Sequence, residues 1–296
     1  MSRMVRVLHV DAFSTTPRMG NPAGVVLDAS GLDDEAMQHV AREVGFNETA
    51  FVLPSARGDL RLRYFTPGHE VNLCGHATVA SFVALHHHGL LPRPVPCRLM
   101  LETLAGMLPI VLEIDPVGQL MVTMTQAPAQ FVEFQGNRAK LARSLGVEEA
   151  DFDPELPVVY GSTGLWTLVV PVRTLAAIRR MIPRNAEFPD VLAEMPTASV
   201  HPFCREVIDP QSHLHARHFS SPRSGTTEDP VTGTASGVLG AYYRKFIGSP
   251  PSPLVVEQGQ EVGRDGRVLV WTDQRGEMCE VRIAGAGCLV GEQIVD

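Results

Sequence analysis

Two short segments place reactive side chains beside a glycine, where the sequence predicts the start of a helix. The first is CGHAT at residues 74–78 and the second is TGTAS at residues 232–236. A helix N-terminus has about four free backbone N–H groups and carries roughly half a positive charge. Glycine there lets a ligand approach the backbone closely. Two such ends facing each other would bind an anion, most simply a carboxylate.

The residues that follow both segments predict buried helices. After Gly75 the chain is small or apolar on nearly all sides as far as Leu85, and after Gly233 it is so again as far as Tyr242. A helix that is apolar all round is buried, whereas a surface helix has a polar face. We therefore expect each helix at the centre of a domain, with its first turn facing the ligand.

The elements around these helices occur twice in the same order. A strand pair follows each helix, opened by ETLAG at 102–106 and by EQGQEVG at 257–263. Two copies at a long period indicate two related domains rather than a solenoid. Many short strands with two buried helices favour an α+β fold, in which a curved sheet or barrel wraps each helix. Alternating or apolar runs predict strands over residues 5–12, 24–27, 49–53, 60–65 and 280–285.

Proline and polar residues near position 127 mark the expected domain boundary. We predict an N-terminal domain over 1–127 and a C-terminal domain over 128–283. The tail, about 284–296, is expected to return to the first domain.

Composition disfavours several classes of function. The 296 residues include 25 Lys and Arg against 33 Asp and Glu, a formal net charge of −8, which disfavours nucleic acid and anionic membranes as partners. No apolar run approaches the ~20 residues of a membrane helix. The five cysteines are scattered without a CxxC pair, so we expect neither disulfides nor structural zinc, and a cytoplasmic location. No nucleotide fingerprint, metal motif or pyridoxal phosphate pattern occurs, so we predict no metal and no cofactor.

Four motifs in a fixed order give the chain a resemblance to the PhzF-like family of phenazine-biosynthesis isomerases. The family has the diaminopimelate-epimerase-like fold of two duplicated domains. The resemblance covers nearly the whole chain, and it implies a homodimer and cofactor-free chemistry on a small carboxylate substrate. The motifs are VDAF with GNPA within 10–23, NETAFVL at 47–53, YFTP to LCGHAT at 64–78, and EDPVTGTASG at 228–237.

The resemblance also implies roles for individual residues. Glu48 corresponds to the family's essential acid/base, and His76 and Asp229 correspond to two further catalytic residues. Thr234 replaces a residue that is usually serine in the characterised isomerase and keeps the hydroxyl. The implied substrate-binding residues are Gly75, Thr232, Gly233 and Thr234.

The chemistry of these side chains fits a proton shift on a carbon skeleton. A carboxylate can remove a proton and return it elsewhere when its environment holds it near the working pH. Glu48 lies between a helix and a strand, where burial would favour its protonated form. The positive helix end would keep His76 neutral and able to bind an amine, a carboxylate or a hydroxyl. We therefore predict a cofactor-independent isomerase that acts on a small amino or hydroxy acid in a cleft between the domains.

Cys74 keeps a second interpretation open. In epimerases and racemases of this fold, two cysteines act on opposite faces of the substrate, and Cys74 matches the first position. The second position is Thr232, whose hydroxyl is a poor acid/base near neutrality. A one-thiol epimerase, racemase or dehydratase of an amino or imino acid remains an alternative, since a helix N-terminus favours the thiolate. A small-molecule binding protein without catalysis is the third hypothesis.

Overall fold

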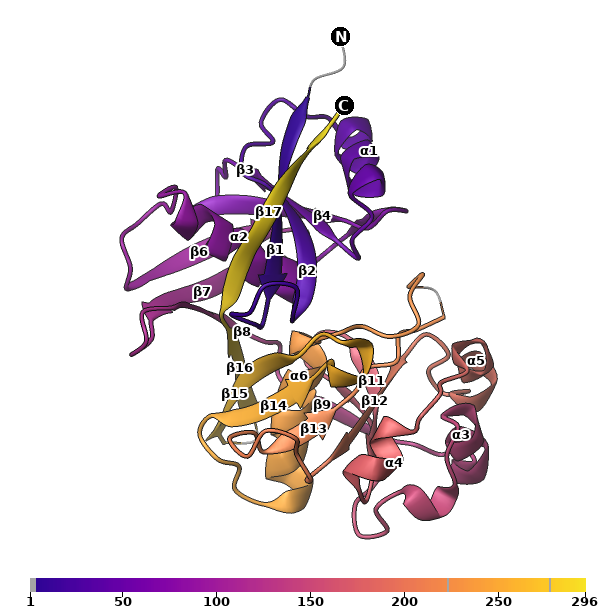
Figure 1. Ribbon diagram of the computed structural model, residues 1–296. Helices are drawn as coiled ribbons and strands as arrows, with labels where there is room; N and C mark the ends of the chain where they lie inside the picture. The colour runs from indigo at the N-terminus through magenta and orange to yellow at the C-terminus, as the bar shows by residue number, and fades with distance from the viewer. Residues whose placement is uncertain (1–3, 223, 277) are drawn as a thin grey trace. The chain divides into compact units, whose positions relative to one another are not determined.

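The computed structural model describes residues 4–222, 224–276 and 278–296, which form two compact units (Figure 1). The first unit comprises Met1–Thr125 with Ala284–Asp296, and the second comprises Gln126–Ile283. Both units combine strands with a few helices, so the predicted α+β class is confirmed. Among the described residues, no helix has the length and apolar character required to cross a membrane.

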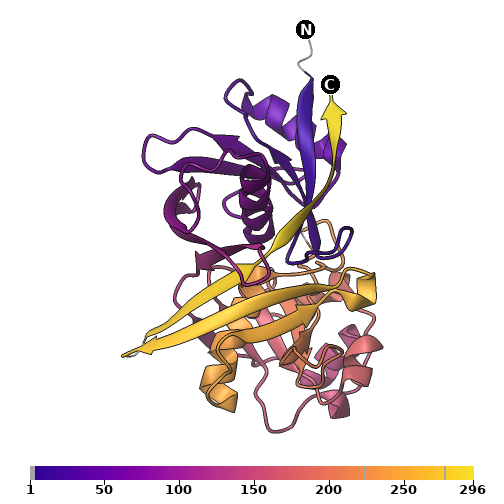
Figure 2. The same ribbon diagram turned by 60° about the vertical axis from the view of Figure 1, so that its left-hand side comes forward.

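The first unit is a sheet of mixed direction with two helices. Strand β1 pairs antiparallel with both β2 and β17, and β2 continues in parallel to β3. Figures 1 and 2 both show β17, in yellow, alongside β1, so the end of the chain lies beside its beginning. The elements are β1 Val5–Ala12, β2 Asn21–Val26, α1 Asp34–Val44, β3 Thr49–Leu53, β4 Leu60–Phe65, β5 Glu70–Val71, α2 Gly75–His87, β6 Cys97–Thr103, β7 Gly106–Ile114, β8 Leu120–Thr125 and β17 Gly287–Val295.

Helix α2 lies at the centre of the first unit. It contacts β1, β2, β3, β8 and β17, and every residue from His76 to Leu85 is buried. Short side chains such as Ala77, Ala80 and Ala84, all 0% exposed, allow the strands to pack closely against it. The prediction that this helix is buried is therefore confirmed.

The second unit has a similar sheet with more helices around it. Three of them, α3 to α5, were not expected from the sequence, because helices of seven, five and four residues are too short to show a period. The elements are β9 Gln130–Glu133, α3 Arg138–Ser144, η1 Glu149–Asp151, β10 Val159–Ser162, β11 Trp166–Pro171, α4 Leu175–Arg179, η2 Asn185–Glu187, α5 Phe188–Val191, β12 Ser199–Cys204, β13 Leu214–Ala216, α6 Gly233–Tyr242, η3 Tyr243–Ile247, β14 Leu254–Gln258, η4 Gln260–Val262, β15 Gly266–Arg275 and β16 Met278–Gly285.

Helix α6 is buried at every residue except Thr234, which confirms the second predicted buried helix. Glycine is required at its packing surface. A Cβ atom on Gly240 would lie 2.5 Å from a methyl group of Val270 on β15, closer than real contacts allow. Because glycine has no side chain, the helix can pack directly against the sheet at this position.

Strand directions repeat between the units and establish the duplication. From β1 through β2, β3, β4 and β6 to β7, successive pairs are antiparallel, parallel, antiparallel, parallel and antiparallel. From β10 through β11, β12, β13 and β14 to β15, the same order recurs. Helix α2 precedes β6, and α6 precedes β14, at matching points. The predicted duplicated architecture is confirmed.

Candidate active site

Glu48, Cys74 and His76 lie together in the first unit. The Nε2 atom of His76 is 3.3 Å from Oε2 of Glu48, and its Nδ1 atom is 3.4 Å from the sulfur of Cys74. Cys74 and His76 are buried, at 8% and 7% exposure. The Glu48 side chain keeps 20% of its surface exposed, so it is the most accessible of the three side chains.

Local structure explains how Glu48 comes to this place. Helix α1 begins at an Asp33 cap whose side chain accepts from the Ala36 N–H at 2.9 Å. It ends at Gly45, whose φ of 72° terminates the helix and whose N–H bonds back to Ala41. Glu48 follows three residues later, directly before β3, and its carbonyl accepts from the Gly24 N–H at 3.2 Å. The backbone of Glu48 is thereby fixed to the sheet.

A chain of hydroxyl groups fixes the start of α2. The Cys74 carbonyl accepts from the Thr78 N–H at 3.1 Å and from the Thr78 hydroxyl at 2.7 Å. Because that hydroxyl donates its proton to Cys74, the Tyr64 hydroxyl, 2.7 Å away, is the donor to Thr78. Burial raises the pKa of Tyr64, so the phenol stays protonated. The thiol of Cys74 therefore projects from a rigid backbone.

The imidazole of His76 connects a carboxylate with a thiol. A neutral ring that donates from Nε2 to Glu48 leaves Nδ1 to accept from Cys74. This arrangement can pass a proton between the three groups. Their ligand atoms also lie within 4.8 Å of one another, and carboxylate, thiolate and imidazole are donors that zinc accepts. The sequence does not indicate this trio as a metal-binding set, because Glu48 lies far from the other two residues along the chain.

Asp229 and Thr232 lie together in the second unit, in the loop that leads into α6. The Thr232 hydroxyl donates to Oδ2 of Asp229 at 2.6 Å. The Asp229 N–H donates to the carbonyl of His218 at 2.9 Å. Gln258, the last residue of β14, accepts from the Thr232 N–H at 3.2 Å and donates to the Asp229 carbonyl at 2.9 Å. Both ends of this short loop are therefore held by the sheet.

The residue before Asp229 is anchored by a buried ion pair. Arg217 donates from Nε and Nη2 to the two oxygens of Glu228, at 2.9 and 2.7 Å. Its Nη1 donates to the carbonyls of Ile178 and Met181, at 3.1 and 2.9 Å. The two side chains are only 7% and 9% exposed. This bidentate pair holds the loop in a geometry that lysine cannot reproduce.

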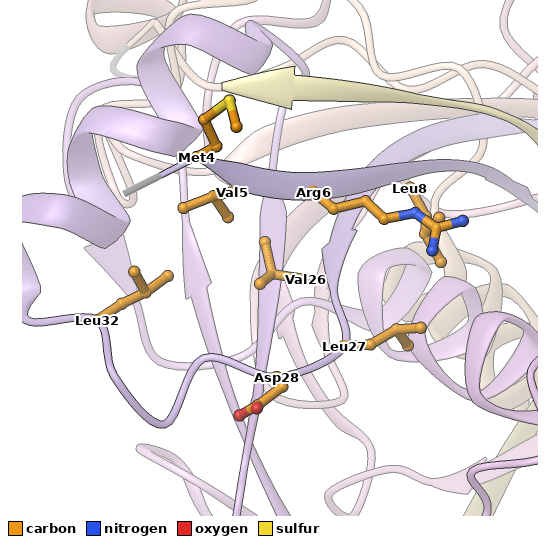
Figure 3. A pocket seen from close by; sticks show the side chains of 8 residues that line it. All are labelled: Met4, Val5, Arg6, Leu8, Val26, Leu27, Asp28 and Leu32. Atoms are coloured by element: carbon orange, nitrogen blue, oxygen red, sulfur yellow. The ribbon is translucent and has the colours of Figure 1, made fainter. Parts of the chain in front are cut away.

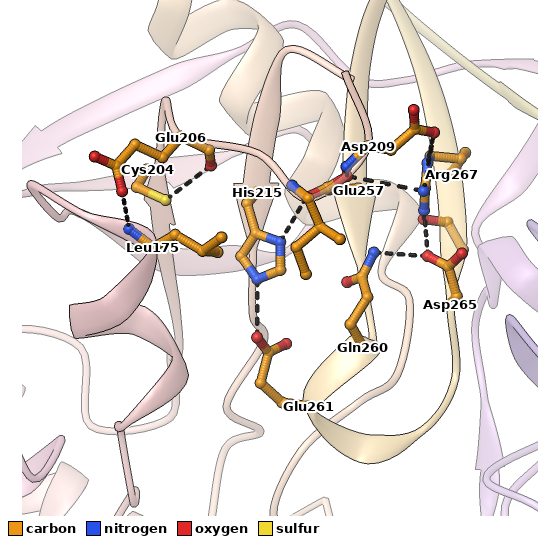
Figure 4. A network of polar contacts seen from close by, with 12 residues as sticks. Leu175, Cys204, Glu206, Asp209, His215, Glu257, Gln260, Glu261, Asp265 and Arg267 are labelled. Carbon is orange, nitrogen blue, oxygen red and sulfur yellow. Dashed lines mark hydrogen bonds and ion pairs between the residues drawn. The ribbon is translucent and has the colours of Figure 1, made fainter. Parts of the chain in front are cut away.

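A second charged cluster lies at the ends of β13 and β14 (Figure 4). His215 contacts Glu257 at 2.9 Å through Nδ1 and Glu261 at 3.1 Å through Nε2. Burial lowers the pKa of His215, but the hydrogen bonds to both glutamates outweigh it and the net pKa is raised. Burial raises the pKa of Glu257, but His215 and the N–H groups of Ile208 and Asp209 bring it down to about 2. The two glutamates therefore favour the protonated form of His215.

Figure 3 shows a pocket in the first unit that contains none of the candidate catalytic residues. Its two charged groups already have partners, because Arg6 donates to Glu292 at 2.7 Å and Asp28 accepts from the Ser30 N–H at 3.0 Å. The remaining lining is largely hydrocarbon and offers no acid/base pair. The lining residues are Met4, Val5, Arg6, Leu8, Val26, Leu27, Asp28 and Leu32.

The predicted site residues form two groups, one in each unit. Glu48, Cys74 and His76 gather at the start of α2, which contains Gly75. Asp229 and Thr232 gather at the start of α6, where Gly233 is buried and Thr234 is half-buried. That these groups meet in one cleft stays a prediction. Gln258 was missed, because a glutamine at a strand end does not indicate which loop it reaches.

Nearly the whole chain is similar to one family of known proteins. The family model described as phenazine biosynthesis-like protein matches residues 10–293. A protein of Bacillus subtilis called uncharacterized isomerase YfhB is 48% identical over 94% of both chains. The trans-2,3-dihydro-3-hydroxyanthranilate isomerase of Pseudomonas aeruginosa is 30% identical over 98% of both chains.

Solved structures support the fold. The crystal structure of a PhzF-family phenazine biosynthesis protein from Bacillus anthracis is 50% identical, with a TM-score of 0.96 over 100% of both chains. A hydroxyproline epimerase from Agrobacterium vitis shares the fold at 16% identity, with a TM-score of 0.64 over 99% of this chain and 91% of its own.

Proposed function

Because the chain belongs to the phenazine biosynthesis-like family, whose named relatives are isomerases, we propose that it is a cofactor-independent isomerase. It moves a proton within a small carboxylate that bears an amino or hydroxyl group. The Pseudomonas relative is named for trans-2,3-dihydro-3-hydroxyanthranilate, a compound with all three groups. We take this compound as the first substrate to test.

The contact between Glu48 and His76 carries this proposal. The carboxylate lies 3.3 Å from Nε2 of the imidazole, and the Glu48 side chain is 20% exposed. A carboxylate in this position removes a proton from the substrate carbon and returns it at another carbon, while His76 orients it. Asp229 binds the amino group of the substrate, and the N–H groups at Gly75 and Gly233 bind its carboxylate.

The contact between Cys74 and His76 favours a second candidate function. A thiol 3.4 Å from an imidazole nitrogen can give up its proton to the ring and act as a base. An epimerase, racemase or dehydratase of an amino or imino acid would use Cys74 in this way. A racemase with two thiols is disfavoured, because Thr232 occupies the second position and its hydroxyl donates to Asp229.

Exchange of substrate hydrogen with deuterated solvent tests the proposal. NMR or mass spectrometry follows deuterium uptake into trans-2,3-dihydro-3-hydroxyanthranilate and a panel of amino and hydroxy acids. Glu48→Gln preserves the shape and removes the base, so exchange is expected to fall by roughly 10²–10⁴-fold. Cys74→Ala is expected to keep most of the exchange.

Matched variants separate the three hypotheses. Glu43→Gln, at an exposed position of α1, controls for the loss of a carboxylate, and Cys97→Ala controls for the loss of a thiol. Full exchange in Glu48→Gln with loss in Cys74→Ala would replace the isomerase proposal with the one-thiol epimerase. Binding of these acids without exchange in any variant would identify a binding protein.

We also propose that the protein is a cytoplasmic homodimer. The dimer extends what is implied by the family, and the location extends what the scattered cysteines predict. Light scattering on the eluate of a size-exclusion column measures the molecular mass against the 32.2 kDa of one chain. A mass of one chain at micromolar concentration would contradict the dimer. Fractionation of cells tests the location.

A further inference from the structure

We propose that Gln258 is a positioning residue, which acts through Thr232 to hold the Asp229 carboxylate in one orientation as a hydrogen-bond acceptor. This inference rests on the proposed function, because it takes Asp229 as a residue that touches the substrate. Gln258 is 1% exposed at the end of β14. Its amide makes three hydrogen bonds to the loop of Asp229 and Thr232.

Two backbone groups decide which way the Gln258 amide points. Its oxygen lies 3.2 Å from the Thr232 N–H, which can only donate. Its nitrogen lies 2.9 Å from the Asp229 carbonyl, which can only accept. A flipped amide would lose both bonds, so the assignment of oxygen and nitrogen is fixed by the backbone.

The fixed amide in turn decides the direction of the next hydrogen bonds. The second N–H of Gln258 donates to the Thr232 hydroxyl at 3.2 Å. That hydroxyl therefore accepts from Gln258, and its own proton points to Oδ2 of Asp229, 2.6 Å away. The hydroxyl proton thereby fixes Oδ2 of Asp229 on the side of the carboxylate that faces Thr232. The three residues form a chain of bonds with one direction, from amide through hydroxyl to carboxylate.

The strand gives Gln258 a rigid base. Its backbone lies between β13 and β15, opposite Ala216 on one side and Gly266 on the other. Gly259 follows with a φ of 100°, where a Cβ atom would lie 1.8 Å from the Arg264 carbonyl and 2.8 Å from the Pro230 carbonyl. Glycine thus allows the Asp229 loop to approach the strand end, which brings Gln258 within bonding distance.

The first unit shows that the fold itself does not require this glutamine. Thr103 ends β6 at the position that matches the end of β14 in the repeated topology. Its hydroxyl donates to the Gly106 carbonyl at 3.1 Å and accepts from the Ala105 N–H at 3.1 Å, within its own turn. The end of β6 is therefore satisfied by a hydroxyl that bonds only within its own turn. The longer side chain of Gln258 instead reaches the loop of Asp229 and Thr232.

Under this proposal, the two carboxylates Asp229 and Glu48 have different roles. Asp229, held as an acceptor, attracts and orients a donor such as a substrate ammonium or amine. It does not carry the transferred proton, which falls to Glu48. Loss of the chain would let the Asp229 carboxylate rotate, and a misplacement of about 1 Å in a catalytic group can cost 10²-fold in rate.

Five variants test this chain by deuterium exchange at saturating substrate. Gln258→Leu and Thr232→Val each remove one link and are expected to lower the exchange rate by about 10²-fold. The double variant is expected to lose no more than either single variant, because both act through one chain. Thr232→Ser keeps the hydroxyl and is expected to restore the rate to within a few-fold of wild type. Gln260→Leu, the same substitution two residues later, is the control and is expected to match wild type.

Asp229→Asn separates this inference from the proposed function. If Asp229→Asn keeps the wild-type rate, the assignment of Asp229 in the proposed function is wrong, and the inference fails with it. If Asp229→Asn loses exchange while Gln258→Leu keeps it, the proposed function stands and the positioning role is refuted. A crystal structure of Gln258→Leu decides the question even without turnover. A Thr232–Asp229 contact retained at 2.6 Å in that variant overturns the inference, and a rotated Asp229 carboxylate supports it.

Discussion

Replacement of His215 by glutamine tests the buried charge cluster beside the Asp229 loop. Glutamine has a similar size and can donate hydrogen bonds from its amide, but it carries no charge. In the variant, Glu257 and Glu261 would both lose the imidazole ring that now contacts them, at 2.9 and 3.1 Å. Because the Glu257 side chain is 0% exposed, water cannot replace the lost partner.

The expected loss comes from the buried charge of Glu257. Its pKa falls from 4.5 to about 2, which corresponds to roughly 3 kcal/mol at about 1.4 kcal/mol for each pH unit, and His215 shares this stabilisation with the N–H groups of Ile208 and Asp209. Removal of one member of a buried pair costs about 3–5 kcal/mol in other proteins, so we expect a loss of about 3 kcal/mol. In a unit of this size, a loss of about 3 kcal/mol lowers the melting temperature by roughly 6–12 °C.

The effect of pH distinguishes lost charge from lost packing. Glu257 has a lowered pKa, so its contribution is present above about 4.5 and disappears as the pH falls towards 2. His215 has a raised pKa, so its contribution is present below 6.5 and disappears as the pH rises through the raised value. The difference in unfolding free energy between wild type and His215→Gln is therefore greatest between about pH 4.5 and 6.5.

Differential scanning calorimetry from pH 4.5 to 9 measures this profile. His213→Gln is the matched control, because its ring accepts a single hydrogen bond, from the Val255 N–H at 2.9 Å, and glutamine can accept that bond. A His215→Gln loss that stays constant across the pH range would refute the electrostatic reasoning. So would a loss no larger than that of His213→Gln at pH 5.5.

Two further substitutions test the supports of the Asp229 loop. Arg217→Lys keeps the charge but cannot form the two hydrogen bonds to Glu228, at 2.9 and 2.7 Å. We therefore expect a loss of about 2 kcal/mol in urea unfolding, and unchanged stability would contradict this. Gly259→Ala places a Cβ atom 1.8 Å from the Arg264 carbonyl and should lower the unfolding free energy, measured by thermal unfolding, by more than about 3 kcal/mol. Its control is Gly263→Ala, because Gly263 also has a positive φ but has open space around it. The control should cost about 1 kcal/mol in thermal unfolding, and equal losses at the two glycines would refute the steric argument.

The parts of the fold that could be predicted are those where burial leaves a pattern in the sequence. Helices α2 and α6 are surrounded by strands, so nearly every position is small or apolar, and that composition is visible without a structure. The repeated order of elements is visible for the same reason. Helices α3 to α5 have too few turns to leave a pattern, and tertiary packing of their few apolar residues stabilises them.

The contacts of the site could not be predicted, because they depend on distances across the chain. Glu48 reaches His76 only after the turn at Gly45 and the start of β3 have set its position. The cluster of His215 with Glu257 and Glu261 could not be predicted either. Charged residues are usually exposed, and the sequence gives no sign that these three are buried together.

The matching positions Cys74 and Thr232 show how the duplicated fold divides its chemistry. In each helix the carbonyl of this residue accepts from the N–H and the hydroxyl of the residue four positions later. The distances are 3.1 and 2.7 Å from Thr78, and 3.1 and 2.9 Å from Ser236. The backbone is thus the same in both units, and the side chains differ.

A thiol beside an imidazole in the first unit can exchange a proton. In the second unit, the Thr232 hydroxyl donates to the Asp229 carboxylate, and it would have to break this hydrogen bond before it could give its proton to a substrate. On the proposed assignment, a reaction that needs acid/base groups on both faces of one carbon would therefore lack its second group. A reaction in which one carboxylate removes a proton and returns it needs no acid/base group from the second unit. The asymmetry between Cys74 and Thr232 thus favours the proposed isomerisation over a racemisation, and under that proposal the second unit orients the substrate.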